Sequence, residues 1–456
     1  MSRSRAVPHV DALDVLRTAV ARLERGFADL PPVSAPTDPA ALDRVLSEVA
    51  DRLRDNYPYF HPLYAGQMLK PPHPVARLAY ELALRINPNN HALDGGRASS
   101  SMEKEAVAEL ATMIGWDTHL GHLCGGGTMA NLEALWIASR LHPGRTIVAS
   151  TQAHYTHQRI TGVLGIPFET IPCDTRGRMA LPALEQRLAA GGVGTVVATM
   201  GTTATGAVDP LAAIVDLRRR FDFRIHADAA YGGYFLLAGN LADDTTLAFE
   251  IIREAASVVI DPHKHGLQPY GCGCVLFRDP SVGRLYRHDS PYTYFTSSEM
   301  HLGEIALECS RPGAAAVALW ATQRLFPLVR GGEFAKGLES GRAAALDLHD
   351  RLCRDDRFIT GATPELDILV WAPRAPSVTE ASSLSKRIFA EAASRQLHLA
   401  LVSLPLQLLD VGPMQRDRDT ILCLRSVLMK PEHRTWADRI WRILEEATTA
   451  AGVRPR

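Results

Sequence analysis

Apolar residues in the first hundred positions recur at helical spacing. Three segments carry this pattern, DALDVLRTAVARLERGF, PAALDRVLSEVADRLRD and PVARLAYELALRI. Each has apolar side chains three or four positions apart, as one face of a helix requires. The connecting stretches YPYFHPLYAGQMLKPPHP and INPNNHALDGG are rich in proline, asparagine and glycine, which disfavour regular elements. We therefore expect an N-terminal helical segment over residues 1–100.

From about residue 101 the pattern becomes an alternation of strand-like and helix-like segments. Short apolar runs, mostly β-branched, read TIVAST, FETIPCD, GTVVATMGTT, RIHADAAY, SVVIDPHK and GCGCVLFRD. Helical patterns such as SMEKEAVAELATMIGW, TMANLEALWIASRL and PLAAIVDLRRRF precede or separate them. This rhythm predicts a mainly parallel sheet covered by helices on both faces, an α/β domain over residues 101–335.

The C-terminal part of the chain has a different pattern. LDILVWAP, LHLALVSLP and TILCLRSVLM are strand-like, and RTWADRIWRILEEATTA has the spacing of a closing helix. The pattern predicts a smaller α+β domain over residues 336–456.

Composition narrows the class of protein. The 456 residues carry 49 basic and 50 acidic side chains, a balance that gives no electrostatic footprint for nucleic acid or an anionic membrane. No apolar stretch is long enough to span a bilayer, and the N-terminus has no signal-peptide pattern. The seven cysteines show no disulfide spacing, which is typical of reduced thiols. We expect a cytoplasmic globular protein.

Polar residues that could take part in catalysis or ligand binding lie at the ends of predicted strands. Asp228 ends the run RIHAD, Lys264 in DPHKHG follows SVVI, and His154 follows TIVAST. The carboxyl ends of parallel strands line the ligand crevice of such a sheet. We therefore expect these three side chains to face one cleft.

A glycine run in CGGGTMANLEAL (124–135) leads directly into a predicted helix. Backbone N–H groups at a helix start, together with the Thr128 hydroxyl, form an anion site that suits phosphate. A ligand that also offers an aldehyde to Lys264 and a protonatable ring nitrogen to Asp228 would use every one of these groups. Pyridoxal 5'-phosphate has all three features, and we predict it as the cofactor.

The ordered motifs GGGTMAN, AHYTH, ATMGTTATGAVD, HADAAYGG and DPHKHG resemble those of the group II amino-acid decarboxylases, a fold-type-I family. The likeness extends from HPLYAGQML near residue 61 to CLRSVLM near residue 423. It implies a carboxy-lyase that converts an L-amino acid to its amine through an external aldimine and a quinonoid, and an aromatic or other medium-sized amino acid is the favoured substrate. It also implies a homodimer with the active site at the interface.

The resemblance assigns roles to individual residues. Lys264 would form the Schiff base, His154 would stack on the cofactor ring, and Asp228 would pair with the ring nitrogen. The other expected cofactor contacts are Gly126, Gly127, Thr128, Thr203, Ala230 and His263. Tyr292 or Tyr294, on a polar loop, would donate the proton to the substrate carbanion. The candidates for substrate contacts, each with an equally good structural explanation, are Tyr64, Asn90, His91 and Arg311.

Two features leave the reaction open. His265 stands where the family commonly has tryptophan, and SRPGAAAVALW (310–320) is closer to microbial tyrosine-decarboxylase and sphingosine-phosphate-lyase relatives. An aminotransferase remains an alternative, with Arg425 as the candidate carboxylate anchor, as do a carbon–carbon lyase, an oxidative aldehyde synthase and a non-catalytic scaffold. His263 and His265 would share one face of a strand, but no third metal ligand accompanies them, so we expect no metal site.

Overall fold

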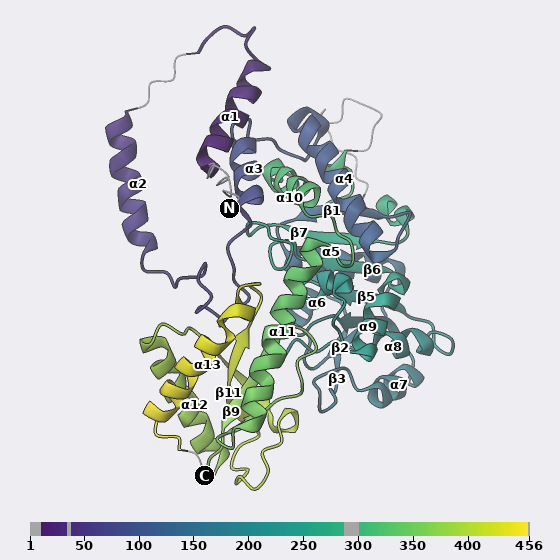
Figure 1. The fold of residues 1–456 in the computed structure, drawn as a ribbon. Coiled ribbons are helices and arrows are strands. Elements are labelled where there is room, and N and C mark those ends of the chain that lie inside the picture. The colour runs from purple at the N-terminus through teal and green to yellow at the C-terminus, as the bar shows by residue number, and fades with distance from the viewer. Residues whose placement is uncertain (1–10, 34–37, 287–300, 455–456) are drawn as a thin grey trace, which may run out of the picture.

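The computed structural model describes residues 11–33, 38–286 and 301–454. In this part of the chain two sheets form, one of seven strands and one of four, and helices cover both (Figure 1). Short 3-10 helices connect the larger elements at Leu93–Gly95, Gly233–Leu237, Ile251–Glu254, Pro280–Leu285, Leu302–Glu304 and Leu406–Leu408.

The larger sheet has the strand order β1-β7-β6-β5-β4-β2-β3. Its strands are β1 (Leu120–Cys124), β2 (Thr146–Ser150), β3 (Phe168–Ile171), β4 (Val193–Thr199), β5 (Arg224–Asp228), β6 (Ser257–Ile260) and β7 (Gly273–Phe277). β7 runs antiparallel to β1 and β6, and the other neighbouring pairs are parallel. This arrangement confirms the mainly parallel sheet, although the sequence pattern did not predict a strand at β1.

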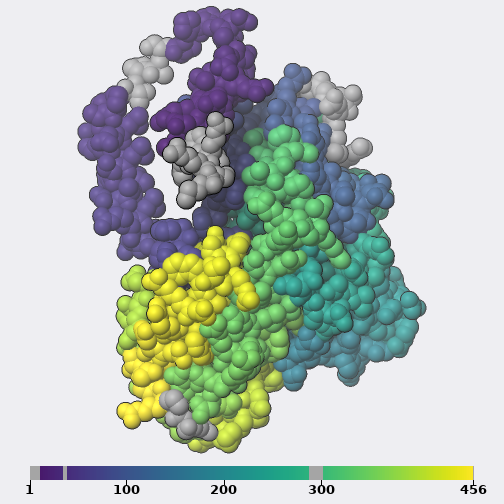
Figure 2. Space-filling view, viewed as in Figure 1, coloured from purple at the N-terminus to yellow at the C-terminus, as the bar shows by residue number. Residues whose placement is uncertain are grey.

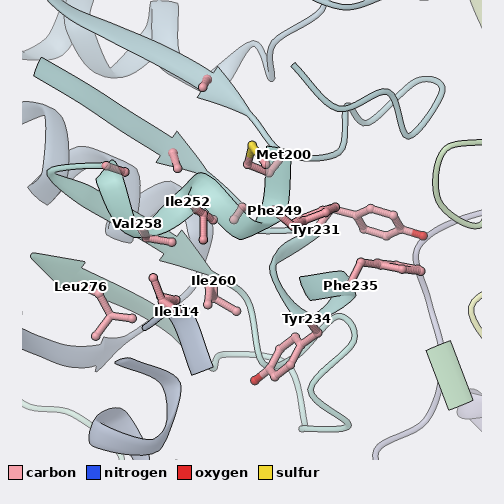
Figure 3. Packing of buried hydrophobic residues seen from close by; sticks show 14 of the residues in the cluster. Ile114, Met200, Tyr231, Tyr234, Phe235, Phe249, Ile252, Val258, Ile260 and Leu276 are labelled. Atoms are coloured by element: carbon pink, nitrogen blue, oxygen red, sulfur yellow. The ribbon is translucent and has the colours of Figure 1, made fainter. Parts of the chain in front are cut away.

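Helices pack on the larger sheet and complete its core. They are α4 (Arg97–Ile114), α5 (Gly127–Leu141), α6 (Thr156–Leu164), α7 (Leu181–Ala189), α8 (Leu211–Leu217), α9 (Asp243–Glu250) and α10 (Gly313–Leu325). Every residue of β4 and β6 is buried, as expected for strands covered on both faces. Figure 3 shows Val258, Ile260 and Leu276 within this core, with Tyr231 and Phe235 extending from it in a common direction.

The smaller sheet is antiparallel throughout. Its order is β10 (Ala400–Pro405), β11 (Thr420–Val427), β9 (Ile368–Pro373) and β8 (Phe358–Thr360). Helices α12 (Val378–Ser394) and α13 (His433–Ala450) pack against it. The predicted C-terminal strands and closing helix are therefore confirmed, and β8 is an addition that the pattern did not reveal.

One long helix, α11 (Glu333–Arg354), belongs to both cores. Phe334 and Leu338 pack in the core of the larger sheet, whereas Leu348 and Leu352 pack in the core of the smaller one. The expected boundary between residues 335 and 336 thus lies inside a continuous helix. The division of the chain into domains stays a prediction.

The three predicted N-terminal helices are present as α1 (Ala12–Arg25), α2 (Pro39–Leu53) and α3 (Pro74–Leu84). α2 has no buried residue and stands away from the rest of the chain in Figures 1 and 2. The exposed apolar side chains on it, at helical spacing, are Leu42, Val45, Leu46, Val49 and Leu53. An isolated helix of this length is only marginally stable in water. Burial of this apolar stripe against another surface would therefore stabilise it.

Candidate active site

The carboxyl ends of β4, β5 and β6 meet the start of α5 around a cavity of about 580 Å³. The cofactor contacts expected from the sequence all lie on its wall: Gly126, Gly127, Thr128, His154, Thr203, Asp228, Ala230, His263 and Lys264. These residues are spread over more than 130 positions of the chain. They lie close together because the carboxyl ends of parallel strands meet at the same edge of the sheet.

Lys264 lies in a turn that follows β6 and faces the cavity. Its ammonium group is 3.0 Å from the Asp261 carboxylate, and the side chains are 22% and 3% exposed, respectively. The same turn holds His263, whose Nδ1 donates to the backbone carbonyl of Cys272 at 2.8 Å. The lysine is therefore both paired with a carboxylate and accessible from the cavity. Asp261 was not among the predicted site residues, although its spacing of three residues from Lys264 in a turn is a signal for this pair.

Asp228 is a buried carboxylate held in its ionised form. His157 Nε2 donates to Asp228 Oδ2 at 2.9 Å, and the backbone N–H of Ala230 donates to Oδ1 at 3.2 Å. Burial alone would raise the pKa of Asp228, but the hydrogen bond from His157 and the nearby charge of Lys264 outweigh it and hold that pKa well below its usual value. Sequence reasoning missed His157, even though it follows His154 by three residues at the start of α6.

A second histidine lies beneath Asp228 on the same strand. His226 contacts Ser257 Oγ through Nδ1 and Asn131 Oδ1 through Nε2, both at 2.8 Å. Burial lowers the pKa of His226 to about 3, so the ring is neutral at physiological pH. It orients the Asn131 amide, which lies on the cavity wall.

The part of the cavity wall at the start of α5 is suited to accept an anion. No side chain caps the start of α5, and Gly126 there has φ +143°, a conformation that favours glycine. A Cβ atom at Gly127 would lie 2.7 Å from Asp261 Oδ2, so only glycine fits this approach. The hydroxyls of Thr128 and Thr156 are 3.3 Å apart beside the helix start. Free backbone N–H groups and hydroxyls at a helix N-terminus are the donors that bind phosphate.

His154 contributes an aromatic ring to the wall of the same cavity. Its Nδ1 accepts a hydrogen bond from the backbone N–H of Thr156 at 3.2 Å. Burial lowers its pKa, which favours the neutral ring. The neutral imidazole is therefore an aromatic group of the cavity wall.

The predicted substrate contacts Asn90 and Arg311 do not line this cavity. Arg311 forms a buried ion pair with Glu103 at 2.7 Å, and Asn90 donates to the other oxygen of Glu103 at 2.6 Å. The partner lies on α4, about two hundred residues earlier in the chain, and local spacing cannot reveal such a pair.

Tyr64 and His91 also lie away from the described cavity wall. Tyr64 is buried among Tyr57, Tyr59 and His398, and its carbonyl accepts from Lys430 Nζ at 2.7 Å. The His91 carbonyl accepts from the backbone N–H of Gly303. Tyr292 and Tyr294, the candidate proton donors, lie outside the described residues.

Arg425, the candidate carboxylate anchor, donates hydrogen bonds mainly to backbone carbonyls. It is buried on β11, and its guanidinium donates to the carbonyls of Thr203, Ala204 and Gly66 at 2.7, 3.2 and 3.3 Å. It also donates to the Gln67 side chain at 3.1 Å. All three of its guanidinium nitrogen atoms donate hydrogen bonds within the protein. The side chain therefore links segments of the chain and is not available to bind a substrate carboxylate.

His263 and His265 do not lie on one face of a strand, because residues 262–266 form a turn instead of continuing the strand. His263 lines the cavity described above, whereas His265 lines a different one. The geometric premise of a paired-histidine metal site is therefore wrong.

The cavity thus offers an amine, an ionised carboxylate, a flat aromatic wall and an anion-binding helix start. These groups fit pyridoxal 5'-phosphate, whose aldehyde, ring nitrogen, ring face and phosphate are their respective complements. The fold and the site define the class of pyridoxal-phosphate proteins with a mainly parallel central sheet.

Comparison with known proteins identifies the family. The model of the pyridoxal-dependent decarboxylase conserved domain matches residues 136–368, and the chain belongs to this family. This membership confirms pyridoxal phosphate as the cofactor.

Individual relatives show the extent of the similarity. The chain is 29% identical to an L-tyrosine decarboxylase of Enterococcus faecium, over 62% of this chain and 63% of that protein. It is 34% identical to a probable L-aspartate decarboxylase of Halobacterium salinarum, over 50% of this chain and 62% of that protein. The match therefore spans less than two thirds of each relative's length. The crystal structure of Oryza sativa TDC with PLP and tryptamine has the same fold, with a TM-score of 0.77, 20% identity and coverage of 98% of this chain and 99% of that one.

No helix among the described residues is long and apolar enough to cross a membrane.

Proposed function

We propose that this protein decarboxylates an L-amino acid to the corresponding amine. The observation that carries the proposal is the placement of Lys264 and Asp228, each with a fixed partner, on the wall of one cavity that also holds the uncapped start of α5. The relatives with the same domain are described as amino-acid decarboxylases.

In the proposed reaction, bound pyridoxal phosphate supplies a carbonyl for the substrate amine and a ring that accepts the electrons of the broken Cα bond. Lys264 would hold the cofactor through its amine, and Asp261 at 3.0 Å is the counterion of its ammonium group. Asp228 keeps a proton at the ring nitrogen, because its carboxylate stays ionised at neutral pH. His154 fixes the plane of the ring, and the start of α5 with Thr128 binds the phosphate.

Loss of CO2 requires a substrate carboxylate that strong cations do not clamp. Among the described residues of the cavity wall, Lys264 is the one lysine or arginine. Arg425, the anchor that an aminotransferase would need, has its donors bound to carbonyls and Gln67. This distribution of charge favours decarboxylation over amino transfer. A carbon–carbon lyase and an oxidative aldehyde synthase use the same cofactor and remain the second candidates.

The same charges bear on the substrate. The wall carries the carboxylates of Asp228, Asp261 and Glu308 and apolar side chains such as Met129 and Leu132. An acidic substrate side chain would meet these carboxylates without a dedicated cation in the described wall. We therefore favour a neutral, aromatic or medium-sized L-amino acid, as in the tyrosine-specific relatives, over aspartate.

The test is product analysis. The cofactor-loaded protein would be incubated separately with L-tyrosine, L-phenylalanine, L-tryptophan, L-aspartate and L-glutamate, and the products identified by mass spectrometry. We expect one or more aromatic amino acids to yield an amine with loss of CO2. A keto acid would indicate amino transfer, an aldehyde with ammonia would indicate oxidation, and either result would contradict the proposal.

We further propose a homodimer in which α1 and α2 are covered by the second copy. Support comes from the apolar stripe of α2, which has no covering residue in the described part of the chain. The loop around Asn90 and His91 would contribute to the partner's active site. A cytoplasmic location is part of the same proposal, since all seven cysteines are free thiols.

Disruption of the α2 stripe is expected to produce monomers. Leu46 and Val49 are 62% and 44% exposed in the single chain, and Leu46→Glu with Val49→Glu would place two charges in the proposed interface. Light scattering after size exclusion should give twice the mass of one chain for the wild type and the mass of one chain for the double variant. Leu247→Glu on α9, where the side chain is 51% exposed, is the matched control and should remain dimeric. A monomeric wild type, or a dimeric double variant, would contradict this interface.

A further inference from the structure

A second cavity, of about 540 Å³, lies behind the turn that carries Lys264. Its wall combines three distant parts of the chain: the segment from Phe60 to Pro74, the start of α11, and residues 429–432 before α13. Phe326 and Phe334 give it an apolar side. The cofactor cavity is separate, since the two share no lining residue.

Two lysines, Lys70 and Lys430, line this second cavity. Lys430 is 4% exposed and donates to the carbonyl of Tyr64 at 2.7 Å, while Lys70 Nζ is 3.4 Å from the carbonyl of Met429. Burial lowers the pKa of each lysine to about 8, so both are largely protonated at pH 7. The acidic residues on the wall, Glu333 and Glu432, are exposed at its rim.

Three helices begin at this cavity, which adds positive potential. Pro74 is the first residue of α3, Glu333 is the first residue of α11, and Glu432 is the N-cap of α13. Neither α11 nor α13 has a side-chain cap, and α3 is capped by His73. Helix N-termini carry partial positive charge and free N–H donors, and both favour an anion.

A buried histidine on the same wall lacks a hydrogen bond. His265 is 2% exposed, and neither of its ring nitrogens has a hydrogen-bond partner among the described residues. Its ring packs against Tyr231 and Phe235 at centroid distances of 4.8 and 5.0 Å. Nε2 lies 3.4 Å from Asp367 Oδ2 without forming a hydrogen bond. Buried polar groups are normally satisfied, so this side chain points to a ligand that the protein alone does not provide.

We propose that this second cavity binds a small-molecule oxyanion, a carboxylate or phosphate attached to an apolar body, between Lys70, Lys430 and His265. The apolar body would pack on Phe326 and Phe334, and the oxyanion would take the lysine ammonium groups and the helix starts as donors. The site is independent of the reaction at Lys264, because none of its residues faces the cofactor cavity.

Calorimetric titration of the cofactor-loaded protein tests the site. The probes are phenylacetate, phenyl phosphate and the neutral isostere phenylacetamide. At least one of the two anions should bind with one site per chain, and phenylacetamide should bind at least about tenfold more weakly, since it cannot form charge-assisted hydrogen bonds. The preferred anion identifies the oxyanion as carboxylate or phosphate.

Variants locate the binding. The Lys70→Gln substitution should lower the affinity for the preferred anion at least about tenfold. The Lys430→Gln substitution should lower it by a similar factor. Thermal unfolding of Lys430→Gln serves as a check, because that lysine also binds the Tyr64 carbonyl. Lys386→Gln, an exposed lysine on α12 outside the cavity, should leave the affinity unchanged. Unchanged affinity in the folded Lys70→Gln variant, equal binding of phenylacetamide, or no binding of either anion up to about 10 mM would overturn the proposal.

The pH dependence provides a second readout. The titratable groups that face Lys70 are Asp367, Glu432, Lys430 and His265, and those that face Lys430 are Lys70, Glu432 and His433. Because both lysines have a pKa of about 8, they lose their protons between pH 7 and pH 9. Anion affinity should fall over this interval in the wild type, and an affinity that stays constant would contradict the role of the lysines.

Discussion

The Lys264→Ala variant is expected to lose decarboxylase activity completely and to form no reducible covalent bond with the cofactor. Among the described residues of the cofactor cavity wall, Lys264 is the one that carries a primary amine. No other described residue of the wall could therefore form the covalent bond in its place. Borohydride reduction, followed by digestion and mass spectrometry, should place the cofactor on the peptide containing residue 264 in the wild type. No cofactor adduct should appear in the variant.

The control for this experiment is Lys386→Ala, which changes an exposed lysine far from the cavity. It should retain both the adduct and the activity. Labelling of a different lysine in the wild type would contradict the assignment of Lys264, whichever reaction the protein catalyses.

The second large effect is expected for Asp228→Asn. Asparagine keeps the shape of the side chain but cannot carry the negative charge that stabilises a protonated ring nitrogen. We expect kcat to fall by at least about a hundredfold, with the cofactor still covalently bound. Steady-state kinetics with the best substrate and the absorbance of the bound cofactor measure the two effects separately. Activity within a few fold of the wild type would remove Asp228 from the mechanism.

His157 provides a finer test of the same carboxylate. His157→Leu removes the hydrogen bond to Asp228 Oδ2, so the pKa of Asp228 should rise toward the value of a buried carboxyl group. Activity would then be lost as pH falls through that raised pKa, at a higher pH than in the wild type. His157→Gln retains an N–H donor and should partly restore the wild-type profile. A simple packing role for His157 would lower activity equally at all pH values.

Much of the fold was predictable because its strands are short apolar runs separated by amphipathic helices. β4 and β6 are buried along their whole lengths, and their sequences are nearly uniform in β-branched and small residues. β1 escaped prediction because Gly121 and His122 interrupt its apolar pattern. β8 has three residues, too few for any period to be visible. The sharing of α11 by two cores depends on packing rather than on its own sequence.

In the candidate site, the residues that follow a strand could be predicted from the sequence, whereas contacts between residues far apart in the chain could not. Lys264, Asp228 and His154 were predictable because each follows a recognisable strand. Their partners were harder to predict: the pair of His157 with Asp228 joins residues 71 positions apart, and the geometry of α6 over the strand end decides it. The ion pair of Arg311 with Glu103 was not predictable for the same reason, since the two residues are distant in sequence.

The hydrogen bonds of Arg425 also restrict how the two sheets can move. Its guanidinium joins β11 of the smaller sheet to the loop after β4 of the larger one and to Gly66 and Gln67 of the N-terminal segment. A hinge rotation between the sheets would break the bonds from Arg425 to the carbonyls of Thr203 and Ala204 and leave a buried cation with fewer partners. The two sheets should therefore behave as one rigid body, and substrates would have to reach Lys264 without any opening of the molecule along this seam.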